Sequence, residues 1–214
     1  TYIRERIQTP AVTHEHHGGI SPDEQQRLLQ LADQQPGLKG LRDYTLFRLW
    51  LDTGVGREEM QSLQVRDLTV KNGIPRIIVR HGKGNRLREV GLESYTASVV
   101  QDWLEISGQS VDEFRPMFIQ VRKQKNPGEQ QARYVVKDPH KPLNVRAYNK
   151  LVDWYVRQAN IVSKITPHSF RVAMVTDFLD GGASLPHVQN IGGWTSPRMI
   201  TEVYDRNLYA DDAG

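Results

Sequence analysis

Apolar side chains recur along most of this chain at the three- to four-residue spacing of amphipathic helices. Ser21, Pro22 and Glu24 have the arrangement of a helix start, with a capping serine, a proline in the first turn and a glutamate three residues after the cap. The pattern predicts a helix that is capped at 20–24 and ends near 34, and further helices at 41–52, 94–107, 144–160, from 167, at 185–191 and from 197.

Two short runs have the alternating character of strands instead. Residues 75–80 and 87–92 partly alternate apolar and polar side chains, and a glycine-rich segment with Lys83 at its centre separates them. These runs predict a β-hairpin with Lys83 at the tip. The expected fold class is therefore mainly α with a small antiparallel β-sheet (α+β).

The composition is that of a globular protein that stays in aqueous solution. The 214 residues are 38% apolar, which is enough for a conventional core. No run approaches the roughly 20 apolar residues of a membrane span, and no signal-peptide core is present, so we expect no membrane partner and a cytoplasmic location. The absence of cysteine excludes disulfides, zinc-thiolate sites and cysteine nucleophiles. His14, His16 and His17 have no carboxylates in register, and we interpret them as linker residues without a metal.

Net charge alone would not predict the binding partner, because 28 lysines and arginines nearly balance 25 acidic residues. Two segments are nevertheless more basic than the rest: the hairpin around Lys83, and residues 115–141, which we expect to form an exposed loop or an extended hairpin. Charge runs are more often solvated faces, but such surfaces can also bind phosphates. The candidates for DNA contact are Arg80, Arg86, Arg88, Arg122, Lys123 and Lys125.

Residues near the C-terminus combine groups that are suited to breaking a phosphodiester. Thr166-Pro167 predicts a helix start, so His168 and Arg171, three residues apart, would point toward the same object. Trp194 offers an indole N–H donor, and Tyr204 falls about two turns into the helix predicted from 197. Taken singly, each has a structural alternative, as a packing aromatic or as an arginine paired with an acidic residue. Their joint order and spacing favour a catalytic site.

The motif H-x-x-R at 168–171, the glycine–tryptophan pair at 193–194 and T-x-x-Y at 201–204 resemble the C-terminal signature of the tyrosine recombinases, the lambda-integrase family. The resemblance implies that Tyr204 attacks a DNA phosphate, that His168 and Arg171 contact it, and that Trp194 replaces a second histidine. It also implies that Lys83 protonates the leaving 5′ oxygen. Because a 3′-phosphotyrosyl link conserves the energy of the broken bond, neither ATP nor a metal is needed, and no cofactor is expected.

The resemblance extends to residues 53–63 with one departure. A gap-free match to the family's T-G-x-R-x-x-E-L-x-x-L stretch puts Gly56 at the arginine position and displaces Arg57 by one residue. One residue is about 100° of rotation on a helix, so the direction of the Arg57 side chain depends on where the helix begins. We expect Arg57 to act as the functional substitute. The alternative is a catalytically weakened or inactive DNA-binding relative.

The resemblance covers residues 21–205 and implies the catalytic-domain architecture of the tyrosine recombinases for residues 20–214. Residues 1–19 are then expected to be a linker from an N-terminal DNA-binding domain. The expected function is site-specific recombination or integration of double-stranded DNA by a homo-tetramer on paired sites, in a prokaryotic or phage setting near the nucleoid. A type IB topoisomerase, which uses the same chemistry to relax one strand, is a further alternative.

Overall fold

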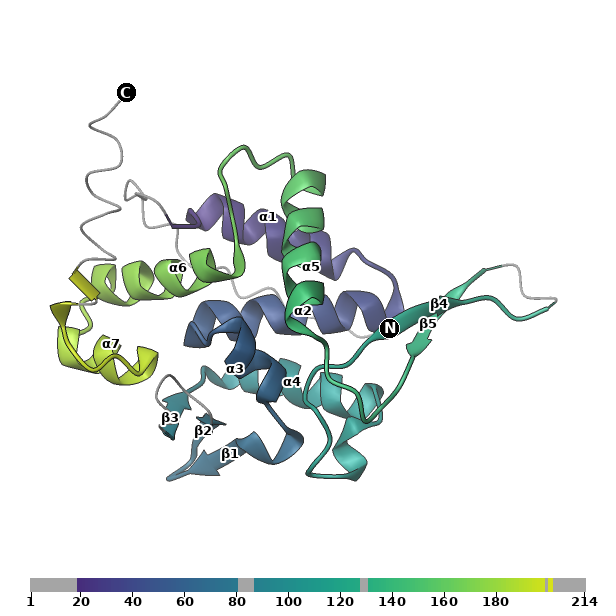
Figure 1. Ribbon diagram of the computed structural model, residues 1–214, viewed down its shortest axis with the longest axis horizontal. Helices are drawn as coiled ribbons and strands as arrows, with labels where there is room; N and C mark the ends of the chain where they lie inside the picture. Colours follow the sequence, from purple (N-terminus) through teal and green to yellow (C-terminus); the bar gives the residue numbers. More distant parts are fainter. Residues whose placement is uncertain (1–18, 81–86, 128–130, 199, 202–214) are drawn as a thin grey trace.

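The computed structural model describes residues 19–80, 87–127, 131–198, 200 and 201. The α-helices in these ranges include α1 (Pro22–Asp33), α2 (Gly37–Thr53), α3 (Arg57–Ser62), α4 (Ser94–Ile106), α5 (Val145–Gln158), α6 (Pro167–Asp180) and α7 (Leu185–Gly192). Together with two small antiparallel sheets they confirm the predicted α+β class (Figure 1). Of the helices described, none has the length and apolar character needed to cross a bilayer.

The helix starts lie where the capping residues predict them. In α1 the backbone N–H of Glu24 donates to the Ser21 hydroxyl at 3.3 Å, and the Ser21 N–H donates back to the Glu24 carboxylate at 3.0 Å. In α6 the backbone N–H of Thr166 donates to the Ser169 hydroxyl at 3.0 Å, and Pro167 occupies the first turn. These contacts satisfy backbone groups that the helix itself leaves unpaired.

The first sheet contains one strand that the hydrophobic pattern did not predict. Its order is β1 (Leu68–Lys71), β2 (Ile74–Val79) and β3 (Arg88–Gly91), all antiparallel. Asn72 and Gly73 join β1 to β2 with φ angles of 54° and 74°, which is the left-handed conformation that an Asn-Gly hairpin turn requires. The turn residues were therefore the available signal for β1, whose own four residues are too few to show alternation.

Helix α2 forms the centre of the core. It packs against α1, α4 and α6, and Leu46, Phe47, Leu49 and Trp50 on it are fully buried. Phe170 of α6 stacks on both Phe47 and Trp50, with ring centroids 5.4 and 5.2 Å apart. The helix begins at Gly37, four residues before the predicted start, and this extra turn carries Lys39, whose Nζ donates to the Tyr155 hydroxyl of α5 at 3.0 Å.

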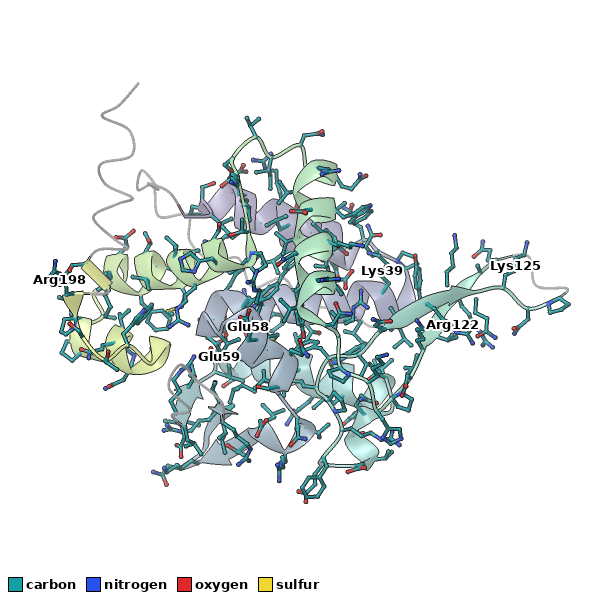
Figure 2. The ribbon with its side chains drawn as sticks, in the orientation of Figure 1. Lys39, Glu58, Glu59, Arg122, Lys125 and Arg198 are labelled. Carbon is teal, nitrogen blue, oxygen red and sulfur yellow. The ribbon has the colours of Figure 1, made fainter. Side chains whose placement is uncertain are left out.

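A buried carboxylate fixes α5 against α2. Asp43 is fully buried and accepts hydrogen bonds from Lys39 Nζ at 2.9 Å, from Arg42 Nε at 2.7 Å and from the Tyr155 hydroxyl at 2.8 Å. A buried charge is tolerated only when it is paired and hydrogen-bonded. The Asp43 carboxylate therefore depends on all three of these donors. They hold α5 across the middle of the molecule, where Lys39 lies beside it (Figure 2).

Candidate active site

A pocket of about 440 Å³ opens between the start of α3, the start of α6 and one face of α5. It brings together three of the residues that the sequence singled out, Arg57, His168 and Arg171. The other lining residues are Val55, Gly56, Glu58, Asn149, Asp153, Thr166 and Pro167. The cap and proline that begin α6 thus place its first turn directly on the pocket wall.

His168 lies in this first turn and remains accessible to solvent. Desolvation by the pocket wall, followed by repulsion from the Arg171 guanidinium, lowers the pKa of His168 below its ordinary value of 6.5. The imidazole is therefore neutral at pH 7. A neutral imidazole can accept a proton or a hydrogen bond from a hydroxyl that enters the pocket.

Arg171 provides positive charge from the floor of the site. Its Nη1 donates to the carbonyl of Gly54 at 3.2 Å, its Nη2 donates to the carbonyl of Gly192, and the Trp194 ring lies 4.3 Å from its guanidinium carbon. Burial lowers the pKa of Arg171 to about 10, even though the Glu59 carboxylate acts in the opposite direction. Arg171 therefore stays charged at neutral pH, as a phosphate-binding group must.

Glu59 and Arg88 form a buried ion pair beneath Arg171. Arg88 Nη1 and Nη2 donate to the two carboxylate oxygens of Glu59 at 2.6 and 2.8 Å, and Arg88 Nε donates to the carbonyl of Ile191 at 2.9 Å. Burial alone would raise the pKa of Glu59, but the hydrogen bonds and charge of Arg88 outweigh it and hold that pKa below 4.5. The pair connects α3, β3 and the end of α7.

Glu59 is a site residue to which sequence reasoning gave no role, although it occupies the glutamate position of the 53–63 motif. Arg88 was expected to contact DNA directly. In the structure the side chain of Arg88 is only 10% exposed. It donates to Glu59 and to the carbonyl of Ile191, and through Glu59 it supports Arg171. A carboxylate three residues into a helix and a basic strand residue carry no sequence signal that they will meet.

The start of α3 decides the direction of Arg57. Gly56 is the N-cap, and its N–H donates to the Glu59 carboxylate at 2.7 Å, so Arg57 is the first residue of the helix. Arg57 Nε donates to the neighbouring Glu58 at 2.9 Å, while Nη1 approaches the Asn149 side-chain oxygen at 3.5 Å, the long limit of a hydrogen bond. Glu58 and Glu59 follow each other at this helix start (Figure 2). The side chain of Arg57 is 44% exposed and lines the pocket.

Asn149 and Asp153 are pocket residues that the sequence gave no reason to choose. They stand four residues apart on α5 and therefore share one face of that helix. They line the pocket because α5 is fixed against α2 by Asp43, which is a tertiary effect. Only the packing of distant segments places them beside Arg57.

Trp194 covers Arg171 because the chain just before it has no side chain. A Cβ built on Gly192 would overlap the Trp194 ring, while Gly193 ends α7 with a left-handed φ of 68°. The glycine pair thus allows the indole to fold back over the end of α7. The ring then shields one side of the guanidinium from water.

Replacing Gly192 by alanine is expected to reduce the free energy of unfolding by about 1 to 3 kcal/mol, because the new methyl group forces Trp194 out of its position. Urea unfolding measures this loss. In a Trp194→Ala background the same substitution should cost little. Gly91→Ala, whose Cβ would meet open space, is the matched control. An equal loss in both backgrounds would contradict this explanation.

The remaining DNA candidates lie apart from the pocket. Arg80 donates from Nε to the buried Asp67 at 2.6 Å and is one-third exposed, whereas Arg122, Lys123 and Lys125 are exposed on a separate hairpin. Lys83, Arg86 and Tyr204 lie outside the described residues.

Helical residues at 198, 200 and 201 follow Ser196, whose hydroxyl accepts the Arg198 N–H at 3.3 Å, as the predicted helix start requires.

Among the described residues, no three histidine, aspartate or glutamate side chains gather in a way that could hold a metal ion. The pocket offers the guanidinium groups of Arg57 and Arg171 and the neutral imidazole of His168. Such a set suits the binding of an anion that gains charge during a reaction.

Comparisons with known proteins identify the family of this chain. The phage integrase family model matches residues 19–211. A tyrosine recombinase XerC of Corynebacterium glutamicum is 27% identical over 166 residues, covering 77% of this chain and 46% of that protein. The XerC protein of Vibrio cholerae is 26% identical over 174 residues, covering 81% of this chain and 49% of its own length. The chain thus spans about half the length of these relatives.

Solved structures share the fold. The XerA recombinase superposes with a TM-score of 0.67 at 21% identity, covering 96% of this chain and 67% of that one. The XerH recombinase in a post-cleavage complex with its difH substrate gives a TM-score of 0.66 at 19% identity, covering 90% of this chain and 51% of that one. The catalytic domain of bacteriophage HP1 integrase gives 0.56 at 14% identity, covering 92% of each chain. This chain belongs to the phage integrase family, the tyrosine recombinases that its C-terminal signature resembles.

Proposed function

We propose that this chain is the catalytic part of a site-specific recombinase that cleaves and rejoins double-stranded DNA through a 3′-phosphotyrosyl intermediate. The observation that carries the proposal is the meeting of Arg57, His168 and Arg171 in one pocket, from segments more than a hundred residues apart. The relatives named tyrosine recombinase XerC and the XerH complex with its DNA substrate support it.

In the proposed reaction the Tyr204 hydroxyl attacks phosphorus in line with the leaving 5′ oxygen. A bond forms between the tyrosine oxygen and phosphorus, the bond to the 5′ oxygen breaks, and Lys83 supplies the proton that this oxygen takes. His168, neutral at pH 7, can accept the tyrosine proton. Arg171 and Arg57 meet the charge that accumulates on the non-bridging oxygens. A 5′ hydroxyl of the partner strand then reverses the step.

Arg57 is proposed to replace the arginine that the family places one residue earlier. Removing it by Arg57→Ala is expected to slow cleavage by about 100-fold, the typical cost of one group that stabilises transition-state charge. Single-turnover cleavage of a selected DNA site measures the rate. Arg157→Ala, at the exposed end of α5, is the matched control and should cleave like the parent chain.

A rescue experiment makes this prediction sharper. A Cβ on Gly56 would meet only the Glu59 side chain, at 3.5 Å, which is ordinary contact. Gly56→Arg combined with Arg57→Ala should therefore fold and recover most of the lost rate. If Arg57→Ala cleaves at the parental rate, Arg57 is not the substitute. If Gly56→Arg alone accelerates cleavage many-fold, the chain is the weakened relative.

We further propose that the protein acts as a tetramer on paired DNA sites. Recombination of a plasmid with two selected sites, and light scattering of a complex with four chains and two duplexes, are the expected results. A type IB topoisomerase would instead relax supercoils without site preference and without pairing. Relaxation of plasmids that lack the site would therefore count against recombination.

A further inference from the structure

A second basic surface lies outside the pocket, on the hairpin formed by β4 (Val121–Gln124) and β5 (Arg133–Val136). This hairpin is a separate two-stranded sheet. It projects from the body of the molecule at the end opposite α7 (Figure 1). Val121 and Val136 pack against the core and anchor its base.

The two strands of this hairpin carry only positive charge, although Glu129 lies between them in the sequence. Residues 121–127 and 131–137 contain Arg122, Lys123, Lys125, Arg133 and Lys137 and no acidic residue, in a chain whose net charge is only +3. All five side chains are exposed. Among the described residues none of the five forms an ion pair. Isolated lysines can simply protect a sheet edge from aggregation, but that purpose does not need five cations.

The register distributes these cations over both faces of the ribbon. Arg122 pairs with Val135 and Gln124 with Arg133, whereas Lys123 pairs with Tyr134. Because directly opposed residues share a face and neighbours along a strand alternate, Arg122 and Arg133 lie on one face and Lys123 on the other. Lys125 follows two residues after Lys123 and extends that alternation. Lys125 lies toward the far end of the hairpin, whereas Arg122 lies nearer its base (Figure 2).

A ribbon that rests on a flat or convex anionic surface would use cations on one face only. A ribbon inside a cleft with anions on both walls would use both. The major groove of B-DNA is such a cleft, since it admits a two-stranded β-ribbon and is bounded by the phosphates of both strands. Arginine side chains can also hydrogen-bond to base edges.

We propose that the β4–β5 hairpin enters the major groove of the duplex beside the cleaved site and forms a second DNA contact. The proposal rests on the proposed function, which makes duplex DNA the substrate. Each phosphate that a cation neutralises adds about 0.9 to the slope of log affinity against log salt concentration. Hairpin cations are therefore expected to account for a slope of about 3 to 4.

The test compares variants that remove the charge of one face at a time in the full chain. Arg122→Gln/Arg133→Gln and Lys123→Gln/Lys125→Gln should each weaken binding to a long nicked duplex and each lower the salt slope by about 2. The matched control, Arg157→Gln/Lys164→Gln, removes two exposed cations elsewhere and should leave both values unchanged. If only one face matters, or neither, the groove assignment is overturned.

Two further measurements locate the contact. Dimethyl sulfate should methylate guanine N7 less in the flanking major groove when the parent chain is bound, but not when all four cations are replaced. Absence of this protection in the parent would contradict the proposal. A loss confined to assembly of several chains, with unchanged binding of one chain to DNA, would assign the hairpin to a second copy instead. At saturating protein the variants should still form the covalent adduct, so failure here is distinguishable from failure of the catalytic proposal.

Discussion

Replacing Arg171 by alanine is expected to slow DNA cleavage by a factor of about 100 to 1,000, the largest effect among the described residues. Arg171 is a charged, partly buried guanidinium on the pocket wall with His168 as its neighbour on α6. Its Nη1 and Nη2 donate to the backbone carbonyls of Gly54 and Gly192. A bound phosphate would accept these hydrogen bonds in place of the carbonyls. Single-turnover cleavage measures the effect.

The control for this prediction separates charge from shape. Arg171→Lys keeps the positive charge but loses the planar fork that matches two phosphate oxygens, so it should fall between the parent and Arg171→Ala. Thermal unfolding must show that both variants are folded. A folded Arg171→Ala protein that cleaves like the parent would contradict the assignment of Arg171 to the phosphate.

Replacing Glu59 by glutamine is expected to lower the free energy of unfolding by about 3 kcal/mol, because Arg88 is left as a buried charge without its partner. The folded-state pKa of Glu59 lies below its unfolded value of 4.5. The stabilisation from the ionised carboxylate is therefore fully present above pH 4.5 and is lost as the pH falls through the folded pKa. Urea unfolding at pH 7 and at pH 3.5 should show a smaller difference between parent and variant at the lower pH.

The double variant Glu59→Leu/Arg88→Met provides the control. Removing both charges together should restore most of the stability, because apolar replacement of a buried ion pair is often neutral. The double variant should nevertheless cleave DNA more slowly than the parent chain, because it also loses the Glu59 carboxylate that lies 3.8 Å from Arg171. Recovery of the parental cleavage rate would mean that the pair has only a structural role.

Local signals in the sequence were sufficient for most of the helices and for the β2–β3 hairpin, but they did not place the short helix α3. Ser21 and Thr166 begin α1 and α6 because capping is a contact over three residues, which a sequence displays directly. The basic segment at 115–141 contains an extended hairpin, one of the two expected forms. Strand β1 was missed although Asn72-Gly73 marked its turn.

The site required information that local patterns do not contain. The meeting of Glu59 with Arg88 depends on how α3 packs beside the sheet, and the position of Asn149 on the packing of α5 against α2. The displacement of Arg57 could not be evaluated from spacing alone. Its outcome depends on the N-cap at Gly56, where the Glu59 carboxylate fixes the first turn of α3.

The most direct test of the central proposal is covalent capture of DNA. The parent chain is incubated with nicked duplexes of randomised core sequence, from which a short fragment escapes after cleavage so that rejoining cannot occur. We predict a denaturant-resistant protein–DNA adduct whose tryptic peptide carries the nucleotide on Tyr204, absent from Tyr204→Phe and retained in Tyr209→Phe. Duplex binding by the parent without an adduct, or an adduct that persists in Tyr204→Phe, would contradict the account.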